Sequence, residues 1–140
     1  MARRKNPPKN DSLDLGKVLG SSDQTSAQVL TLYVPNKDKN GLEFGTQRKW
    51  VLEAAEILAK IGGGVTIMPP VEGGWVDPLG SIVWEHPIIV YSFIKPEALI
   101  QNLPALRRFL HRLGRETNQG EVAVEFDGWF YRITDFDKER

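Results

Sequence analysis

The order in which two hydrophobic periodicities follow one another constrains the fold of this chain more than any other feature. Apolar residues recur at the helical period in two segments, 46–61 and 96–113. Elsewhere they alternate in steps of two or form short β-branched runs, as strands do. The strand-like segments are 28–34, 65–71, 82–94, 122–126 and 129–133. The chain is therefore predicted to run strand, helix, strand, strand, helix, strand, with one extra strand at the end.

This order is the signature of the ferredoxin-like split βαβ sandwich, in which both helices cover one face of an antiparallel sheet. The predicted fold class is α+β, β-α-β-β-α-β plus a terminal hairpin strand. The core is expected between sheet and helices, at Leu32 in the first strand, Trp50 and Leu58 in the first helix, and Leu106 and Leu110 in the second.

Prolines divide these segments. Pro69 and Pro70 restrict the second strand to a sheet edge or a bulged end, because proline cannot donate to the strand ladder. Pro87 interrupts the long strand-like stretch 82–94. Pro104 is expected to kink the second helix or divide it in two, since it lacks a backbone donor and clashes with the preceding turn.

Turn residues mark the remaining connections. The three glycines at 62–64 end the first helix, and residues 73–80 carry several turn signals. Asp127-Gly128 lies between two strand-like runs, which is a strong hairpin signal. No segment resembles a phosphate-binding loop, because the glycine run follows a helix rather than preceding one.

The composition of the chain changes along its length and divides it into an arm, a domain and a charged end. Residues 1–26 are polar and basic near the start and are expected to form a disordered arm, with one turn at most near 13–19. Residues 27–134 form the domain, and 135–140 a charged end.

Lys plus Arg and Asp plus Glu both number 18, so no overall field draws the chain to nucleic acid or to an anionic membrane. With no cysteine and no long apolar stretch, a cytoplasmic protein is expected.

Aromatic residues recur on the strands and are expected to lie on the sheet face that the helices leave open. The candidate binding residues there are Tyr33, Tyr91, Phe93, Trp129 and Tyr131. Two registers are open. In the third strand Val90 and Ile94 could face outward instead, and in the last hairpin Phe130 and Arg132 could do so in place of Trp129 and Tyr131. An exposed aromatic face usually has a partner. A second copy of the chain, a loop or tail of the same chain, and a ligand or nucleic acid are the alternatives.

Short motifs add a family resemblance. They are Leu32-Tyr33, Trp50, Gly64-Val65-Thr66, Gly74-Trp75 before Asp77 and Gly80, and Glu85 before Ile88-Ile89-Val90. Over roughly residues 30–133 the chain resembles small bacterial ferredoxin-like proteins of unknown function. The resemblance implies the fold and no activity or site.

A basic face is expected on the second helix, opposite its leucines. Its members are Arg107, Arg108, His111, Arg112 and Arg115. Such a face can grip phosphates. The alternatives are a solvated face and pairing with the acidic residues of 116–140, where seven acids face three bases.

Acids near Trp75 provide the enzymatic alternative. Glu72, Asp77 and Glu85 could lie together at one end of the sheet and do acid–base chemistry. His86 follows Glu85, but neighbouring strand residues point to opposite faces, so a structural role is favoured. No catalytic residue, metal site or cofactor is predicted.

The sequence therefore favours a binding or regulatory module that acts through its open aromatic sheet face as a homodimer, or with another protein, and not with a membrane. The first alternative is a small enzyme with a pocket near Trp75 and Glu85. The second is a nucleic-acid-associated factor that uses the basic arm and the second helix.

Overall fold

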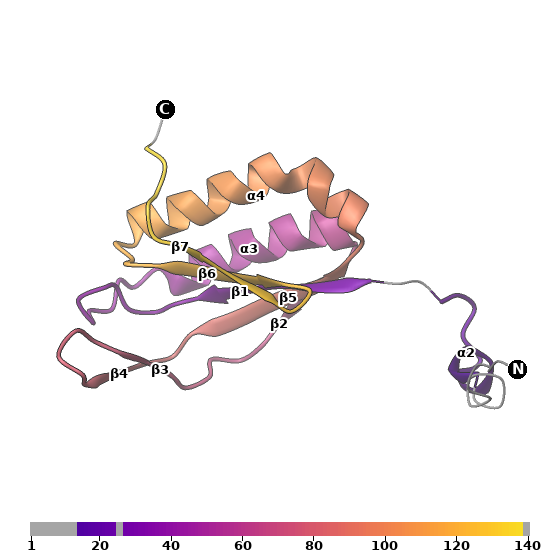
Figure 1. Cartoon of the computed structure of the whole chain (residues 1–140), viewed down its shortest axis with the longest axis horizontal. Helices are drawn as coiled ribbons and strands as arrows, with labels where there is room; N and C mark the ends of the chain where they lie inside the picture. Colours follow the sequence, from indigo (N-terminus) through magenta and orange to yellow (C-terminus); the bar gives the residue numbers. More distant parts are fainter. Residues whose placement is uncertain (1–13, 25–26, 139–140) are drawn as a thin grey trace, which may run out of the picture.

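The computed structural model describes residues 14–24 and 27–138 (Figure 1). Within these ranges the helices are α2 (Leu15–Leu19), α3 (Gln47–Gly62) and α4 (Pro96–Glu116). The strands are β1 (Gln28–Val34), β2 (Thr66–Ile67), β3 (Gly73–Val76), β4 (Ile82–Glu85), β5 (Ile88–Ile94), β6 (Val122–Phe126) and β7 (Trp129–Ile133). Most of the predicted arm, residues 1–13 and 25–26, lies outside the described residues. Its described part holds the short helix α2, which buries no side chain.

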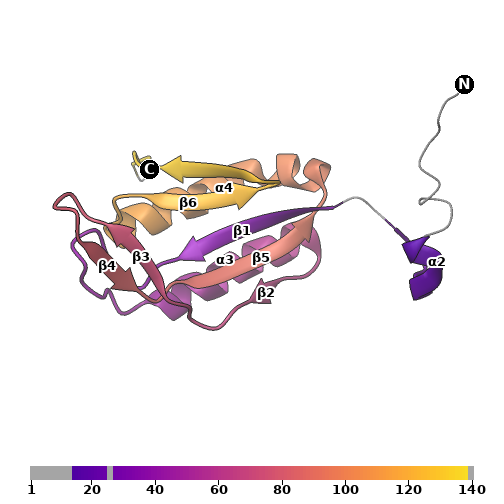
Figure 2. The same ribbon diagram turned by 60° about the horizontal axis from the view of Figure 1, so that its bottom comes forward.

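Five strands form one antiparallel sheet in the order β2-β5-β1-β6-β7 (Figure 2). The central strand β1 pairs with β5 along its whole length, from Gln28↔Ile94 to Val34↔Ile88. The predicted α+β class with an antiparallel sheet is confirmed. Of the predicted strand 65–71 only β2 forms, which ends before Pro69 and Pro70 and lies at the sheet edge, where proline is tolerated.

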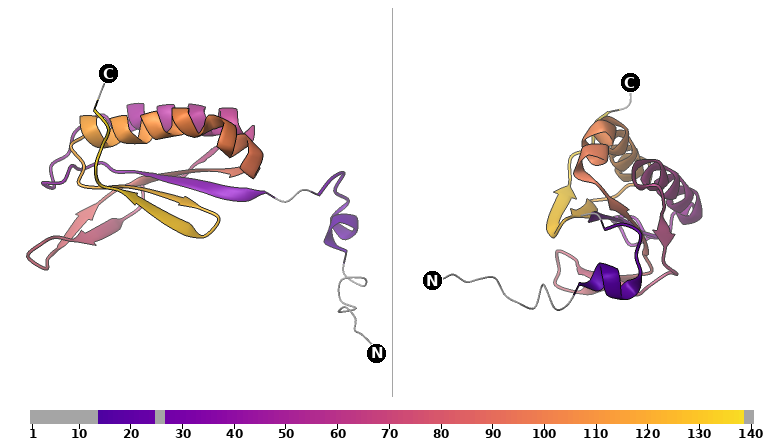
Figure 3. Two further views of the ribbon diagram at one scale, coloured as in Figure 1. Left: turned by 45° about the horizontal axis from the view of Figure 1, so that its top comes forward. Right: turned by 90° about the vertical axis from the view of Figure 1, so that its right-hand side faces the viewer.

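Helices α3 and α4 lie side by side on one face of this sheet (Figure 3). All five predicted core residues are buried. Trp50 is at the centre, with its ring 6.0 Å from that of Phe109 on α4, at an interplanar angle of 56°. The other face of the sheet has no helix over it, so side chains alternate between a covered and an open face along each strand.

The second long helix is continuous. It runs through Pro104 as one helix, so of the two expected outcomes, a kink or a division in two, the division is not found. Leu99 before the proline and Leu106 after it both pack against the core. This packing on a shared core offsets the roughly 3 kcal/mol that an internal proline costs a helix.

The stretch 73–80 is more than a set of turns. Gly73–Val76 forms strand β3, which pairs with β4 in a separate two-stranded hairpin. The Asp77 carboxylate accepts hydrogen bonds from the backbone N–H groups of Leu79 and Ser81 and so closes the turn. The hairpin leaves the end of the sheet and points away from the helices (Figure 3). Within the described residues, no helix is long and apolar enough to cross a membrane.

Candidate functional site

The open face of the sheet carries three of the five predicted aromatic residues. Tyr33 on β1 and Tyr91 and Phe93 on β5 alternate with residues that are buried under the helices. Of the two registers left open for β5, the one that turns Tyr91 and Phe93 outward is therefore found. The Phe93 side chain is 61% exposed, and the Tyr91 ring meets it edge-on at 6.0 Å.

Trp129 and Tyr131 do not belong to this face, so the prediction that placed them there is wrong. The two-residue turn at 127–128 pairs Phe126 with Trp129 and Val124 with Tyr131. Directly opposed residues of an antiparallel pair share a face. Val124 is buried on the helix side, and Tyr131 therefore lies on that side as well. Phe130, which is 56% exposed, takes the place of Trp129 and Tyr131 on the open face.

The polar groups of the open face are paired within the chain. The Tyr33 hydroxyl donates a hydrogen bond to Glu125 Oε1 at 2.8 Å. Partial burial and, after it, this carboxylate raise the pKa of Tyr33, which keeps the phenol protonated. On β7, Arg132 Nε lies 3.0 Å from Glu121 Oε1. The face therefore presents apolar rings and compensated charges.

The β3–β4 hairpin adds a second exposed apolar surface. Val76, Ile82 and Trp84 share one face of the hairpin, because Val76 pairs with Ile82 and Gly74 with Trp84. All three side chains are exposed, Trp84 at 59%, and Leu79 at the turn is almost fully exposed. The opposite hairpin face, with Trp75 and Val83, is partly buried. We call the open sheet face together with this exposed hairpin face the open surface.

Glu85 lies at the base of the hairpin and is half-buried. Its Oε1 atom is buried and has no hydrogen-bond partner among the described residues. Burial raises the pKa of this carboxyl, and the nearby Lys37 ammonium acts in the opposite direction. Lys37 itself donates a hydrogen bond to the Trp84 carbonyl at 2.8 Å. Glu85 is thus a carboxyl with an unusual environment beside Trp84, at the junction of hairpin and sheet.

Replacement of Glu85 by Gln is expected to stabilise the protein at neutral pH and to change little near pH 4. An acid whose pKa is raised by folding binds more protons in the folded chain, so its contribution to stability is lost as pH rises through the raised value. Gln keeps the shape and removes the buried charge. Thermal melts of both proteins at the two pH values measure the difference. A variant that is less stable at neutral pH would mean that the charge has an unrecognised partner.

Asp77 and His86 do not join Glu85 in one cluster. Asp77 closes the hairpin turn, at the opposite end of β4. His86 is exposed and contributes its backbone: its N–H donates to Asn36 Oδ1, and its carbonyl accepts from Gln47 Nε2. Within the described residues no group of three His, Cys, Asp or Glu side chains is placed to hold a metal.

The predicted basic face of α4 is largely engaged by acids of the same chain. Arg107 binds the Asp137 carboxylate through two hydrogen bonds of 2.8 and 2.9 Å. Arg112 binds Glu53 of α3, and Arg115 donates to the Asp137 carbonyl. The arginine next to Glu53 lowers the pKa of that carboxyl. Of the alternatives for this face, internal pairing describes these three arginines, while Arg108 is exposed.

His111 is not part of that exposed face, which corrects the prediction. Only 6% of it is exposed, because the segment 135–137 crosses α4 above it. The Asp137 backbone N–H donates to His111 Nδ1 at 2.7 Å, and the Phe136 ring meets the imidazole edge-on. We call residues 135–137 the C-terminal strap.

The fold and this site define an α+β protein with an antiparallel sheet, two covering helices and a projecting hairpin. No family model and no curated protein matches the chain. Among solved structures it is similar to a phage SAM lyase in complex with S-methyl-5'-thioadenosine, with 16% identity and a TM-score of 0.58 over 81% of this chain and 95% of that one. A phage SAM lyase in the apo state gives 16% identity and a TM-score of 0.53 over 84% and 98%. At this identity the likeness concerns the fold.

Proposed function

We propose that this protein is a binding module whose open surface docks a second copy of the same chain. The observation that carries the proposal is the exposure of large apolar side chains, Phe93 and Phe130 on the open sheet face and Trp84 on the exposed hairpin face. These residues, with Val76, Ile82 and Leu79, expose on the order of several hundred Å² of apolar surface, which soluble monomers rarely leave open.

The chemistry of the open surface favours a partner like itself. Its polar groups are engaged within the chain, since the Glu125 carboxylate accepts the Tyr33 hydroxyl and Arg132 pairs with Glu121, so it offers little to a charged partner. Two such surfaces related by a two-fold axis would bury each other's rings. A standard interface buries roughly 800 Å² per partner, so the dimer would have to use the sheet face and the hairpin face together.

The proposal includes the fold type and the location. Without the hairpin and β7, the strand order β2-β5-β1-β6 supports a ferredoxin-like sandwich, because each half of the chain contributes one edge strand and one inner strand. We keep the cytoplasm as the proposed location, with which a chain lacking cysteine is compatible.

Light scattering at micromolar concentration is expected to give about twice the chain mass of 15.8 kDa. Phe93→Asp and Trp84→Asp, which bring a charge into the interface, should each shift the mass to one chain. Trp129→Asp is the matched control, since Trp129 is equally exposed but lies on the helix side of β7. A wild-type monomer, or a dimer that only Trp129→Asp dissociates, contradicts the proposal.

A small enzyme is the second candidate, and Glu85 is the observation in its favour. A half-buried carboxyl with a raised pKa and an unpartnered oxygen is suited to proton transfer. The structures similar to this one are of a lyase that acts on SAM, and one contains S-methyl-5'-thioadenosine. The protein incubated with SAM should then release S-methyl-5'-thioadenosine, detectable by chromatography, and Glu85→Gln should abolish the release. Unchanged SAM would remove this candidate.

A further inference from the structure

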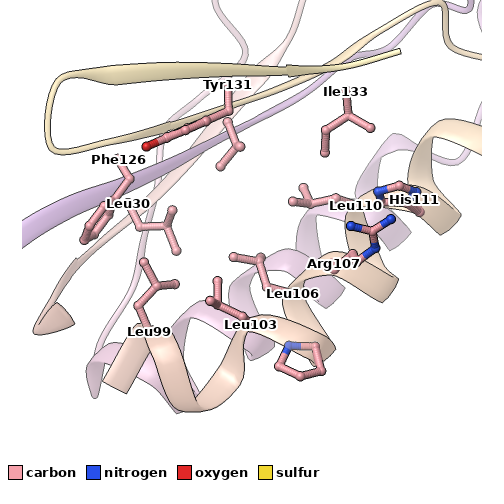
Figure 4. Close-up of a pocket in the computed structure, with 12 residues that line it drawn as sticks. Leu30, Leu99, Leu103, Leu106, Arg107, Leu110, His111, Phe126, Tyr131 and Ile133 are labelled. Carbon is pink, nitrogen blue, oxygen red and sulfur yellow. The ribbon is translucent and has the colours of Figure 1, made fainter. Parts of the chain in front are cut away.

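A groove of about 640 Å³ lies on the other side of the sheet, away from the open surface. It runs between α4 and the β6–β7 hairpin, where the sheet extends beyond the covering helix (Figure 4). Leu99, Leu103 and Leu106 form one wall, and Phe126 and Tyr131 form the other. Its volume is in the range of small-molecule sites, and its lining is almost entirely apolar, as such sites are.

The charged side chain that lines the groove lies at one end of it, and the Tyr131 hydroxyl lies at the other end, near Phe126 (Figure 4). Arg107 and His111 lie at the first end, while Leu99, Leu103 and Phe126 lie toward the second (Figure 4). The Arg107 side chain is well exposed. Its guanidinium group already binds a carboxylate, that of Asp137 on the C-terminal strap. The two bonds run from Nε to Oδ2 and from Nη2 to Oδ1, which is the bidentate geometry that selects carboxylates.

We infer that this groove binds a small amphiphile that has one carboxylate and an apolar tail. The tail lies along the leucines of α4, and the carboxylate replaces that of Asp137 on Arg107. The Asp137 side chain is therefore an internal occupant of the head-group position. An apolar channel with one cationic end matches a ligand with one anionic end, and the carboxylate seated on Arg107 identifies the head group that this end accepts.

The strap can release the Asp137 carboxylate without leaving α4. The backbone of Asp137 is held separately, through its N–H on His111 Nδ1 and its carbonyl on Arg115. Phe136 packs closely over Gly114, where any side chain would collide with the ring. The Asp137 side chain itself is about half exposed, so it can turn into solvent when a ligand arrives.

Titration calorimetry with hexanoate, octanoate and decanoate tests the inference on the full chain. Each added methylene that the groove buries should raise affinity about fourfold. Decanol, which has the same tail and no carboxylate, should bind more weakly than decanoate. Arg107→Gln should remove this preference, whereas Arg108→Gln, an exposed neighbour outside the groove, should keep it. Asp137→Asn should tighten alkanoate binding several-fold, because it withdraws the competing carboxylate.

A second variant separates a lost site from lost folding. Leu103 is partly exposed, so Leu103→Trp should fill the groove and abolish binding while the melting temperature stays close to that of the wild type. Alkanoate affinity that does not depend on tail length, equal binding of decanol and decanoate, or unchanged binding by Leu103→Trp each overturns the inference. So does a change of chain mass on Leu103→Trp, which would assign the groove to a second copy of the chain.

Discussion

Trp50→Ala is expected to lower the free energy of unfolding by about 3–5 kcal/mol, the usual cost of removing a buried aromatic side chain. Trp50 is 2% exposed and packs between sheet and helices against Phe109. Its indole N–H donates to Thr46 Oγ1 at the start of α3, and the Arg112 guanidinium lies 5.1 Å from its ring centre. The substitution thus removes core volume and a contact that joins α3 to α4.

Chemical denaturation of the variant and the wild type measures this loss. Domains of this size have about 5–15 kcal/mol of stability, so a large fraction of it should disappear. Trp129→Ala is the matched control: the same side chain is removed from an exposed position on β7, and the change should stay within about 0.5 kcal/mol. Similar losses for both variants would show that the core is centred elsewhere.

The helices and the inner strands could be predicted because their periodicities agree with a single buried face. Leu32 and Leu58 are buried where alternation and helical spacing place them. The hairpin at 127–128 could also be predicted, since both of its turn residues adopt the positive φ that Asp-Gly accommodates. In these elements, local preference and tertiary packing favour the same structure.

Strand β3 could not be predicted, because two glycines at 73–74 lack strand preference. It forms because the Trp84 ring covers Gly74 so closely that a side chain there would touch it. The face of Trp129 and Tyr131 depends on the pairing between β1 and β6, which joins segments far apart in the sequence. Alternation within a strand shows that two faces exist, but it does not show which one the helices cover.

The candidate sites depend on long-range contacts of the same kind. The seven acids of residues 116–140 indicated that the positive charge on α4 could be neutralised within the chain. No pattern singled out Asp137 as the partner of Arg107. Burial of His111 likewise depends on the strap, which the sequence presents as a charged end. The groove arises where β7 extends beyond α4, so the leucines there resemble ordinary core residues in the sequence.

Gly62→Ala is the second change with a large expected effect. It should lower stability, whereas helix propensity alone would predict that it raises stability. Gly62 lies in the last turn of α3, where alanine would normally be favoured by about 1 kcal/mol. Here an added Cβ would lie within 2.9 Å of the Phe93 carbonyl oxygen and closer still to Ser92 Oγ. Ser92 is buried and donates a 2.5 Å hydrogen bond to the Gly64 carbonyl, so it cannot turn away without losing that bond.

The end of α3 must therefore move off β5, which costs about 1–3 kcal/mol as other overpacked cores do. Gly64→Ala is the matched control two residues on: nothing lies within 4 Å of its added Cβ, and its φ is not in the left-handed region. That substitution should leave stability unchanged or raise it by about 0.4–1 kcal/mol through the unfolded chain. Denaturation curves should thus shift to lower denaturant concentration for Gly62→Ala but not for Gly64→Ala, and a stabilised Gly62→Ala would show that α3 does not approach β5 this closely.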